Sequence, residues 1–162
     1  MELTLEMPTH CVLTRPFLLS GKATITVAIP KEFVSKNQTP DHYTYQIRVT
    51  GKRDAAYVWL LNGPDNINSY VYLAQLNMKS GEVSVTRKSA FPKGAWPVVI
   101  ADRVLQRLFA NEQHVIEERG WKVMHIGRCG RCSRPLTTPA SLECGLGPEC
   151  AEALGVPHGK TE

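Results

Sequence analysis

The chain has 162 residues, a formal net charge of +4 at pH 7, 43% hydrophobic and 21% charged residues. These values are typical of one soluble globular domain with a small appendage, and they exclude a disordered or fibrous chain. The apolar runs fall far short of the roughly 20 residues that a membrane span needs. The N-terminal residues 1–6 carry acids where a secretion signal carries basic residues. We therefore expect a cytoplasmic protein with no membrane partner.

The chain up to about residue 87 has the pattern of β-strands and turns. Residues 18–29 are rich in β-branched side chains, and residues 43–49 alternate apolar and polar side chains, which predicts one buried and one wet face. Turn-forming residues follow the apolar run 57–61. Two further strands are predicted at 69–76 and 82–87. Five strands joined by short loops favour an antiparallel meander.

The pattern becomes helical after residue 97. Apolar side chains recur at three- and four-residue spacing over 98–110, which predicts an amphipathic helix packed on the sheet. Residues 111–119 either continue it or form another helical turn, and a short strand is predicted at 121–126. The expected fold is therefore α+β: an antiparallel β-meander with one packed helix over residues 1–120, and a finger module over residues 121–162 packed on it.

Four of the five cysteines lie close together near the C-terminus. Cys129 and Cys132 have the two-residue gap that lets two thiolates from one tight turn bind a single Zn²⁺. Cys150 follows Pro148, a residue suited to the first position of a helix, so a ligand in a first helical turn is expected. Cys144 is the predicted fourth ligand and His125 the alternative. This layout predicts a treble-clef or zinc-ribbon-like finger with a structural zinc ion.

The stretch 125–151 carries the motifs G-R-C-G-R-C-S-R-P-L-T, P-x-S-L and G-L-G-P-E-C-A. With them it resembles a short zinc-finger domain of unknown function found in many tailed-phage and prophage-derived proteins. The preceding part, with G-K-A-T-I-T-V, N-G-P-D-N and T-R-K-S, resembles the β-rich region before this finger in phage proteins of similar length. The resemblance implies a phage or prophage origin and no activity. In that family the position of Cys144 is often not cysteine, which keeps His125 open as a ligand.

A zinc site closed by four protein ligands leaves no position for water or substrate, so it folds the finger and does not catalyse. The sequence contains no nucleophile, P-loop or dinucleotide signature. We therefore expect a protein that is not an enzyme. The polar loop 62–68 leaves open an alternative, a nucleotide-binding protein or enzyme that uses this loop.

Basic residues gather at two places in the sequence. Lys122, Arg128, Arg131 and Arg134 occur between residues 121 and 142 without any acid. A second set precedes the helix beside Phe91 and Trp96 and consists of Arg87, Lys88 and Lys93. Either set alone is explained by solvated surface charge, but two sets with a finger favour phosphate contacts.

The resulting hypothesis is a small phage-type accessory protein that binds nucleic acid or a nucleic-acid-associated host protein. The alternative partner class is a host defence or transcription protein, bound through the sheet without nucleic acid. Salt dependence separates the two, because phosphate contacts weaken steeply with salt and an apolar interface does not.

Overall fold

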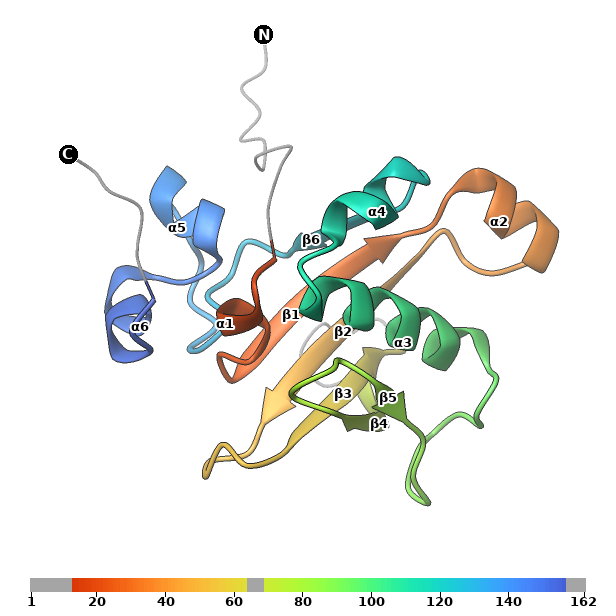
Figure 1. The fold of residues 1–162 in the computed structure, drawn as a ribbon, viewed down its shortest axis with the longest axis horizontal. Helices are drawn as coiled ribbons and strands as arrows, with labels where there is room; N and C mark the ends of the chain where they lie inside the picture. Colours follow the sequence, from red (N-terminus) through yellow and green to blue (C-terminus); the bar gives the residue numbers. More distant parts are fainter. Residues whose placement is uncertain (1–12, 64–68, 157–162) are drawn as a thin grey trace, which may run out of the picture.

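The computed structural model describes residues 13–63 and 69–156, which form an α+β fold around one antiparallel sheet (Figure 1). The strands are β1 (Lys22–Ala28), β2 (His42–Val49), β3 (Ala56–Leu61), β4 (Tyr70–Leu76), β5 (Val83–Ser84) and β6 (Lys122–His125). Their order in the sheet is β5-β4-β3-β2-β1-β6. The predicted five-strand meander is therefore present, and the predicted strand at 121–126 returns to pair with β1.

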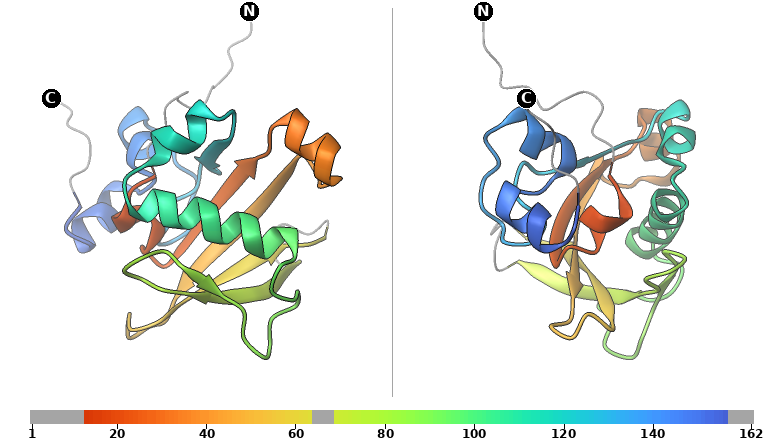
Figure 2. Two further views of the ribbon diagram at one scale, coloured as in Figure 1. Left: turned by 45° about the vertical axis from the view of Figure 1, so that its right-hand side comes forward. Right: turned by 60° about the vertical axis from the view of Figure 1, so that its left-hand side comes forward.

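Helices lie on one face and at both ends of this sheet (Figure 2). They are α1 (Arg15–Leu18), α2 (Lys31–Asn37), α3 (Trp96–Phe109), α4 (Gln113–Glu118), α5 (Pro139–Cys144) and α6 (Pro148–Ala153). The amphipathic helix predicted at 98–110 is α3, which crosses the sheet, while α5 and α6 sit together beside α1 (Figures 1 and 2). In the described part of the chain, no helix has the length and apolarity needed to cross a membrane.

The core lies between α3 and the face of the sheet that α3 covers. Ile25, Tyr45 and Ile47 point into it and are fully buried. The Tyr45 hydroxyl donates a 2.7 Å hydrogen bond to the carbonyl oxygen of Pro97 in α3. Because a buried hydroxyl needs a partner, this bond fixes where the start of α3 meets the sheet.

The turn before β5 is fitted closely to α3. The backbone N–H of Val83 donates to Asp102 Oδ1 at 2.9 Å. Gly81 has φ of +81°, and a Cβ at this position would lie 2.6 Å from the carbonyl oxygen of Leu105. Only glycine meets both the left-handed backbone and the close approach.

The other face of the sheet carries polar and aromatic side chains. The register pairs Thr24 with Gln46, Gln46 with Trp59, and Trp59 with Tyr72, so these four side chains form a row across four strands. Trp59 and Tyr72 are half-buried, and their rings meet edge to face at 5.6 Å. None of the helices α1 to α6 covers this face, called the uncovered face below, in the views of Figures 1 and 2.

Several boundaries differ from the sequence prediction. The strand expected from residue 18 begins only at Lys22, because Thr14 caps the short helix α1 through its side chain. Helix α2 occupies a connection that was expected to be a short loop. The strand expected at 82–87 is only Val83–Ser84. Cys11 and residues 64–68 of the polar loop lie outside the described residues.

Candidate metal centre

Three cysteines from two separate segments meet at the end of the sheet beside α1. The sulfur atoms of Cys129, Cys132 and Cys150 all lie within 4.8 Å of one another. Cys129 and Cys150 are buried and Cys132 is exposed. These three of the predicted ligands therefore form a group that could hold a metal ion.

The local backbone explains how the two segments present these thiols. Cys129 and Cys132 flank a turn in which the N–H of Ser133 bonds to the Cys129 carbonyl at 2.9 Å. Helix α6 begins at Pro148 as predicted, and this places Cys150 in its first turn. The Arg131 guanidinium lies 3.6 Å from the Cys150 sulfur. Burial raises the pKa of Cys150, and the contact with Arg131 acts in the opposite direction.

Cys129 is the thiol whose surroundings most favour the charged form. Burial alone raises its pKa, but hydrogen bonds from the backbone N–H groups of Gly147, Cys132 and Arg131 and from the side chain of Cys150 outweigh burial and lower the pKa to about 7. The Arg131 N–H lies 3.4 Å from the sulfur. Because the thiolate is the form that binds metal, these hydrogen bonds make Cys129 a suitable metal ligand.

The segment from residue 126 to residue 156, called the finger below, is anchored to α1 and β1 through two glycines. The Lys22 N–H donates to the Gly130 carbonyl at 2.6 Å, and the Gly130 N–H donates to the Gly145 carbonyl at 2.9 Å. A Cβ on Gly145, where φ is +76°, would lie 2.5 Å from the Phe17 ring, and a Cβ on Gly130 would also meet that ring, at 2.7 Å. Phe17 is buried. The backbone of the finger at Gly130 and Gly145 therefore packs directly against the Phe17 ring, where a larger side chain would not fit.

His125, the alternative fourth ligand, has both ring nitrogens engaged. Its Nδ1 accepts a hydrogen bond from the Gly127 N–H at 2.9 Å, and its Nε2 lies 2.6 Å from the Leu142 carbonyl oxygen. Since Nδ1 accepts, Nε2 carries the proton and donates. Burial lowers the pKa of His125, although the bond to Leu142 raises it. The ring thus ties β6 to α5.

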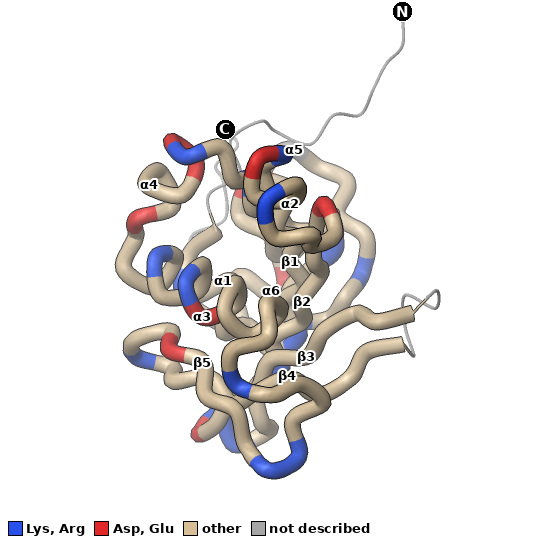
Figure 3. The backbone as a smooth tube through the Cα atoms, turned by 90° about the vertical axis from the view of Figure 1, so that its right-hand side faces the viewer, with Lys and Arg blue, Asp and Glu red and all other residues tan. Residues whose placement is uncertain are grey.

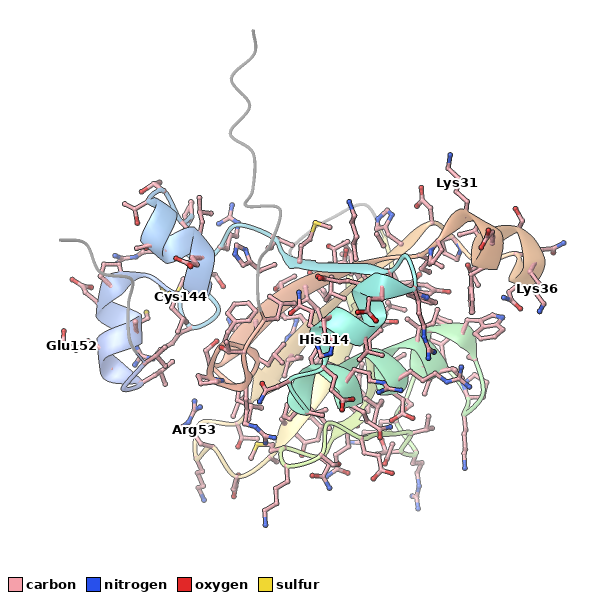
Figure 4. The ribbon with its side chains drawn as sticks, turned by 45° about the horizontal axis from the view of Figure 1, so that its top comes forward. Lys31, Lys36, Arg53, His114, Cys144 and Glu152 are labelled. Carbon is pink, nitrogen blue, oxygen red and sulfur yellow. The ribbon has the colours of Figure 1, made fainter. Side chains whose placement is uncertain are left out.

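Cys144, the preferred fourth ligand, does not belong to the group of three sulfurs. It ends α5, beside α6 (Figure 4), and its thiol lies 3.4 Å from the Leu146 carbonyl oxygen. Burial raises its pKa, and the charge of nearby Cys129 raises it further. Helix α5 was not among the predicted elements, although the sequence has the residues that commonly begin and end a helix. Thr138 caps it, Pro139 occupies its first position, and Gly145 adopts the left-handed conformation at its end.

The two predicted basic sets lie at opposite edges of the sheet. Lys122, Arg128, Arg131 and Arg134 are exposed on β6 and the finger. Arg87, Lys88 and Lys93 follow β5, the strand farthest from β6. Phe91 and Trp96, which lie beside the second set in the sequence, are partly buried against the core. Trp96 also packs edge-on against Phe33. The structure therefore does not join the two sets into one surface.

A pocket that the sequence did not single out connects the finger to the open sheet face. It has a volume of about 660 Å³, and its lining includes Lys22, Gln46 and Arg48 from the sheet and Arg128 and Cys129 from the finger. Its lining within residues 13–63 and 69–156 contains no aspartate or glutamate. By contrast, lysine, arginine and acidic residues are mixed on the helical side (Figure 3). The alternation at 43–49 places Arg48 on the wet face, but only the fold brings it near Arg128.

Only residues 62 and 63 of the polar loop 62–68 are described, so the nucleotide-binding alternative that uses this loop stays a prediction. Asn62 lines a different pocket beside Tyr43 and Phe91. Its N–H donates to the Ser69 carbonyl at 2.8 Å, which closes the β3–β4 connection. The described residues of this loop thus act as a connection between strands.

Residues 123–155 match DUF6011, a family of unknown function. The matched stretch runs from β6 to just beyond α6 and includes Cys129, Cys132 and Cys150, in agreement with a small C-terminal domain. No curated protein and no solved structure compared with the chain matches it. The fold and site therefore define an α+β chain with a C-terminal cysteine cluster, similar over that stretch to this family.

Proposed function

We propose that Cys129, Cys132 and Cys150 bind a structural zinc ion that folds a treble-clef or zinc-ribbon-like finger. The support is the convergence of three sulfurs within 4.8 Å from a turn and a helix. Thiolates at such spacing suit Zn²⁺. The finger buries few apolar residues, chiefly Leu146 and Ala151, so it has only a small hydrophobic core of its own. The ion, when bound, supplies folding free energy to this segment.

Cys144 is proposed as the fourth ligand. The support is nearness to the other ligands: Cys144 lies close enough to Cys129 to feel its charge, and the carbonyl of the adjacent Gly145 accepts a hydrogen bond from Gly130, between Cys129 and Cys132. His125 is disfavoured because both of its nitrogens already form hydrogen bonds within the protein. A site with four cysteine ligands has no open position, which supports a role without catalysis.

For the whole chain we propose binding of nucleic acid. The observation that carries this proposal is the pocket between sheet and finger, which Lys22, Arg48 and Arg128 line together and to which the described residues contribute no acid. Exposed Arg131 and Lys122 extend the positive charge along the finger and β6. Such a positively charged surface attracts phosphate groups, and dissolved salt weakens this attraction. The phage origin and a host-protein partner stay predictions.

Fluorescence anisotropy with labelled DNA and RNA tests the proposal. We expect binding that weakens by at least about tenfold between about 50 mM and 200 mM salt, as phosphate contacts require. Replacing Arg128 and Arg131 together by Gln reduces the affinity. A matched control replaces Lys31 and Lys36, which lie on α2 far from the finger (Figure 4), and leaves the affinity unchanged.

A companion variant, Arg87→Gln with Lys88→Gln, shows whether the far edge of the sheet also contacts the ligand. Absence of any binding at low salt, or binding that salt does not weaken, contradicts the proposed function. The first result would leave a protein partner, held through apolar contacts, as the alternative; the second would show that phosphate contacts do not carry the binding.

A further inference from the structure

The uncovered face of the sheet holds one arginine in a fixed position. Arg48 Nε donates a 2.6 Å hydrogen bond to Gln46 Oε1, and Gln46 Nε2 donates to Thr24 Oγ1 at 3.1 Å. The guanidinium carbon lies 4.1 Å from the centre of the Trp59 ring and 5.8 Å from that of Tyr70. Contacts from β1, β2, β3 and β4 thus orient a single cation.

This cation has no acidic partner in the described ranges 13–63 and 69–156, where the ion pairs join other residues. Burial lowers the pKa of Arg48, although Tyr70 raises it, so the guanidinium is partly withdrawn from water. A charge that is partly desolvated and oriented, and that no carboxylate of the described residues neutralises, is arranged to receive an anion from outside the protein.

Aromatic rings surround the arginine on the same face. Tyr57, Trp59, Tyr70 and Tyr72 come from β3 and β4, and all four are half-buried. The rings of Tyr57 and Tyr72 are 6.0 Å apart. Flat aromatic and guanidinium groups on a sheet suit the stacking of unpaired bases, because every base has a π-face.

We infer that this face binds single-stranded nucleic acid, with backbone phosphates against Lys22, Arg48 and Arg128 and bases against the aromatic residues around Tyr70. The inference rests on the proposed function and specifies its ligand and site. A duplex keeps its base faces stacked inside the helix, so it offers phosphates to the exposed finger arginines but no base to the sheet.

The test compares labelled single strands of about 12 nucleotides, as DNA and as RNA, with a duplex of the same sequence. We expect the wild-type chain to prefer the single strands. Arg48→Gln lowers single-strand affinity by about tenfold or more and reduces the salt slope by about one. Tyr70→Leu lowers single-strand affinity without changing the salt slope, because it removes stacking and no charge.

Arg103→Gln, on the helical side of the sheet, is the matched control and leaves binding unchanged. Circular dichroism and thermal melting confirm that each variant is folded, and Arg48→Lys retains the charge if Arg48→Gln is unstable. Equal affinity for duplex and single strand, or full affinity in folded Arg48 and Tyr70 variants, overturns the inference. If Arg128 and Arg131 still matter in that case, the proposed function stands; if nothing binds, both fail.

Discussion

The guanidinium of Arg48 lies over the ring of Trp59, 4.1 Å from its centre. Arg48 comes from β2 and Trp59 from the neighbouring β3, and their side chains are in contact on the uncovered face of the sheet. Cation–π contacts at such sites contribute about 0.5–1 kcal/mol. A double-mutant cycle with Arg48→Met and Trp59→Leu, measured by urea unfolding, is expected to give a coupling free energy in this range. Additive single-variant effects would show that the two side chains do not interact.

The contact of Gly145 with Phe17 makes a prediction for the stability of the finger. Gly145→Ala adds a Cβ 2.5 Å from a buried ring at φ of +76°. Gly155→Ala adds a Cβ at φ of +70° with no atom within 4 Å, so it shares the backbone strain and lacks the clash. We expect Gly145→Ala to cost about 1–3 kcal/mol more than Gly155→Ala in denaturant unfolding. Equal costs would mean that the finger does not dock on Phe17 as described.

Tyr45 predicts how stability changes at alkaline pH. Burial raises its pKa well above the ordinary value of 10.0, with a smaller contribution from Tyr43. Above pH 10 the unfolded chain therefore loses the tyrosine proton while the folded chain keeps it, so stability falls as pH rises, by up to about 1.4 kcal/mol per pH unit.

The variant Tyr45→Phe loses the hydrogen bond to Pro97, which lowers its free energy of unfolding by about 1 kcal/mol near neutral pH. Because it has no hydroxyl to ionise at position 45, its stability falls less at alkaline pH than that of the wild type. Tyr57→Phe, on the other face, is the control and keeps the full alkaline loss that Tyr45 produces. Unfolding curves between pH 8 and 11 measure both. An unchanged alkaline slope in Tyr45→Phe would contradict the burial of its hydroxyl.

His125 and Cys144 give opposite predictions for metal binding. Cys144→Ser removes a proposed ligand, so zinc affinity is expected to fall by more than about 100-fold. That exceeds the loss expected when a residue that only hydrogen-bonds to a ligand is replaced. His125→Leu breaks the bonds to Gly127 and Leu142 and destabilises the fold, yet the chain keeps its zinc. Competition with a chromophoric chelator measures both. Loss of zinc in His125→Leu with retention in Cys144→Ser would reverse the assignment.

The sequence predicted what short-range patterns determine. Alternation located β2, helical spacing located α3, and Pro148 located the start of α6 with Cys150 in its first turn. It missed α2, which has no side-chain cap, and it gave no means of relating Arg48 to Arg128, 80 positions later. Their proximity depends on β6 pairing with β1, a long-range contact that no local pattern records.

The interpretation of the aromatic residues shows the same limit. Phe91 and Trp96 lie beside basic residues in the sequence, but in the fold both pack against the core. The sequence pattern places Trp59 and Tyr70 only in strands, and the register of the sheet sets both beside Arg48. Which face of a strand is covered depends on where the helices pack, and strand alternation alone does not specify that.

The zinc content of the purified chain tests the central claim most directly. Elemental analysis of protein purified without chelator is expected to give about one zinc per chain, and clearly less for Cys132→Ser. Removal of the ion should also unfold the segment from Cys129 to Ala153, seen as faster amide hydrogen exchange there than in β1 to β4. A folded wild-type chain without bound transition metal, in which Cys129, Cys132 and Cys150 all react freely with a thiol reagent, would contradict the account.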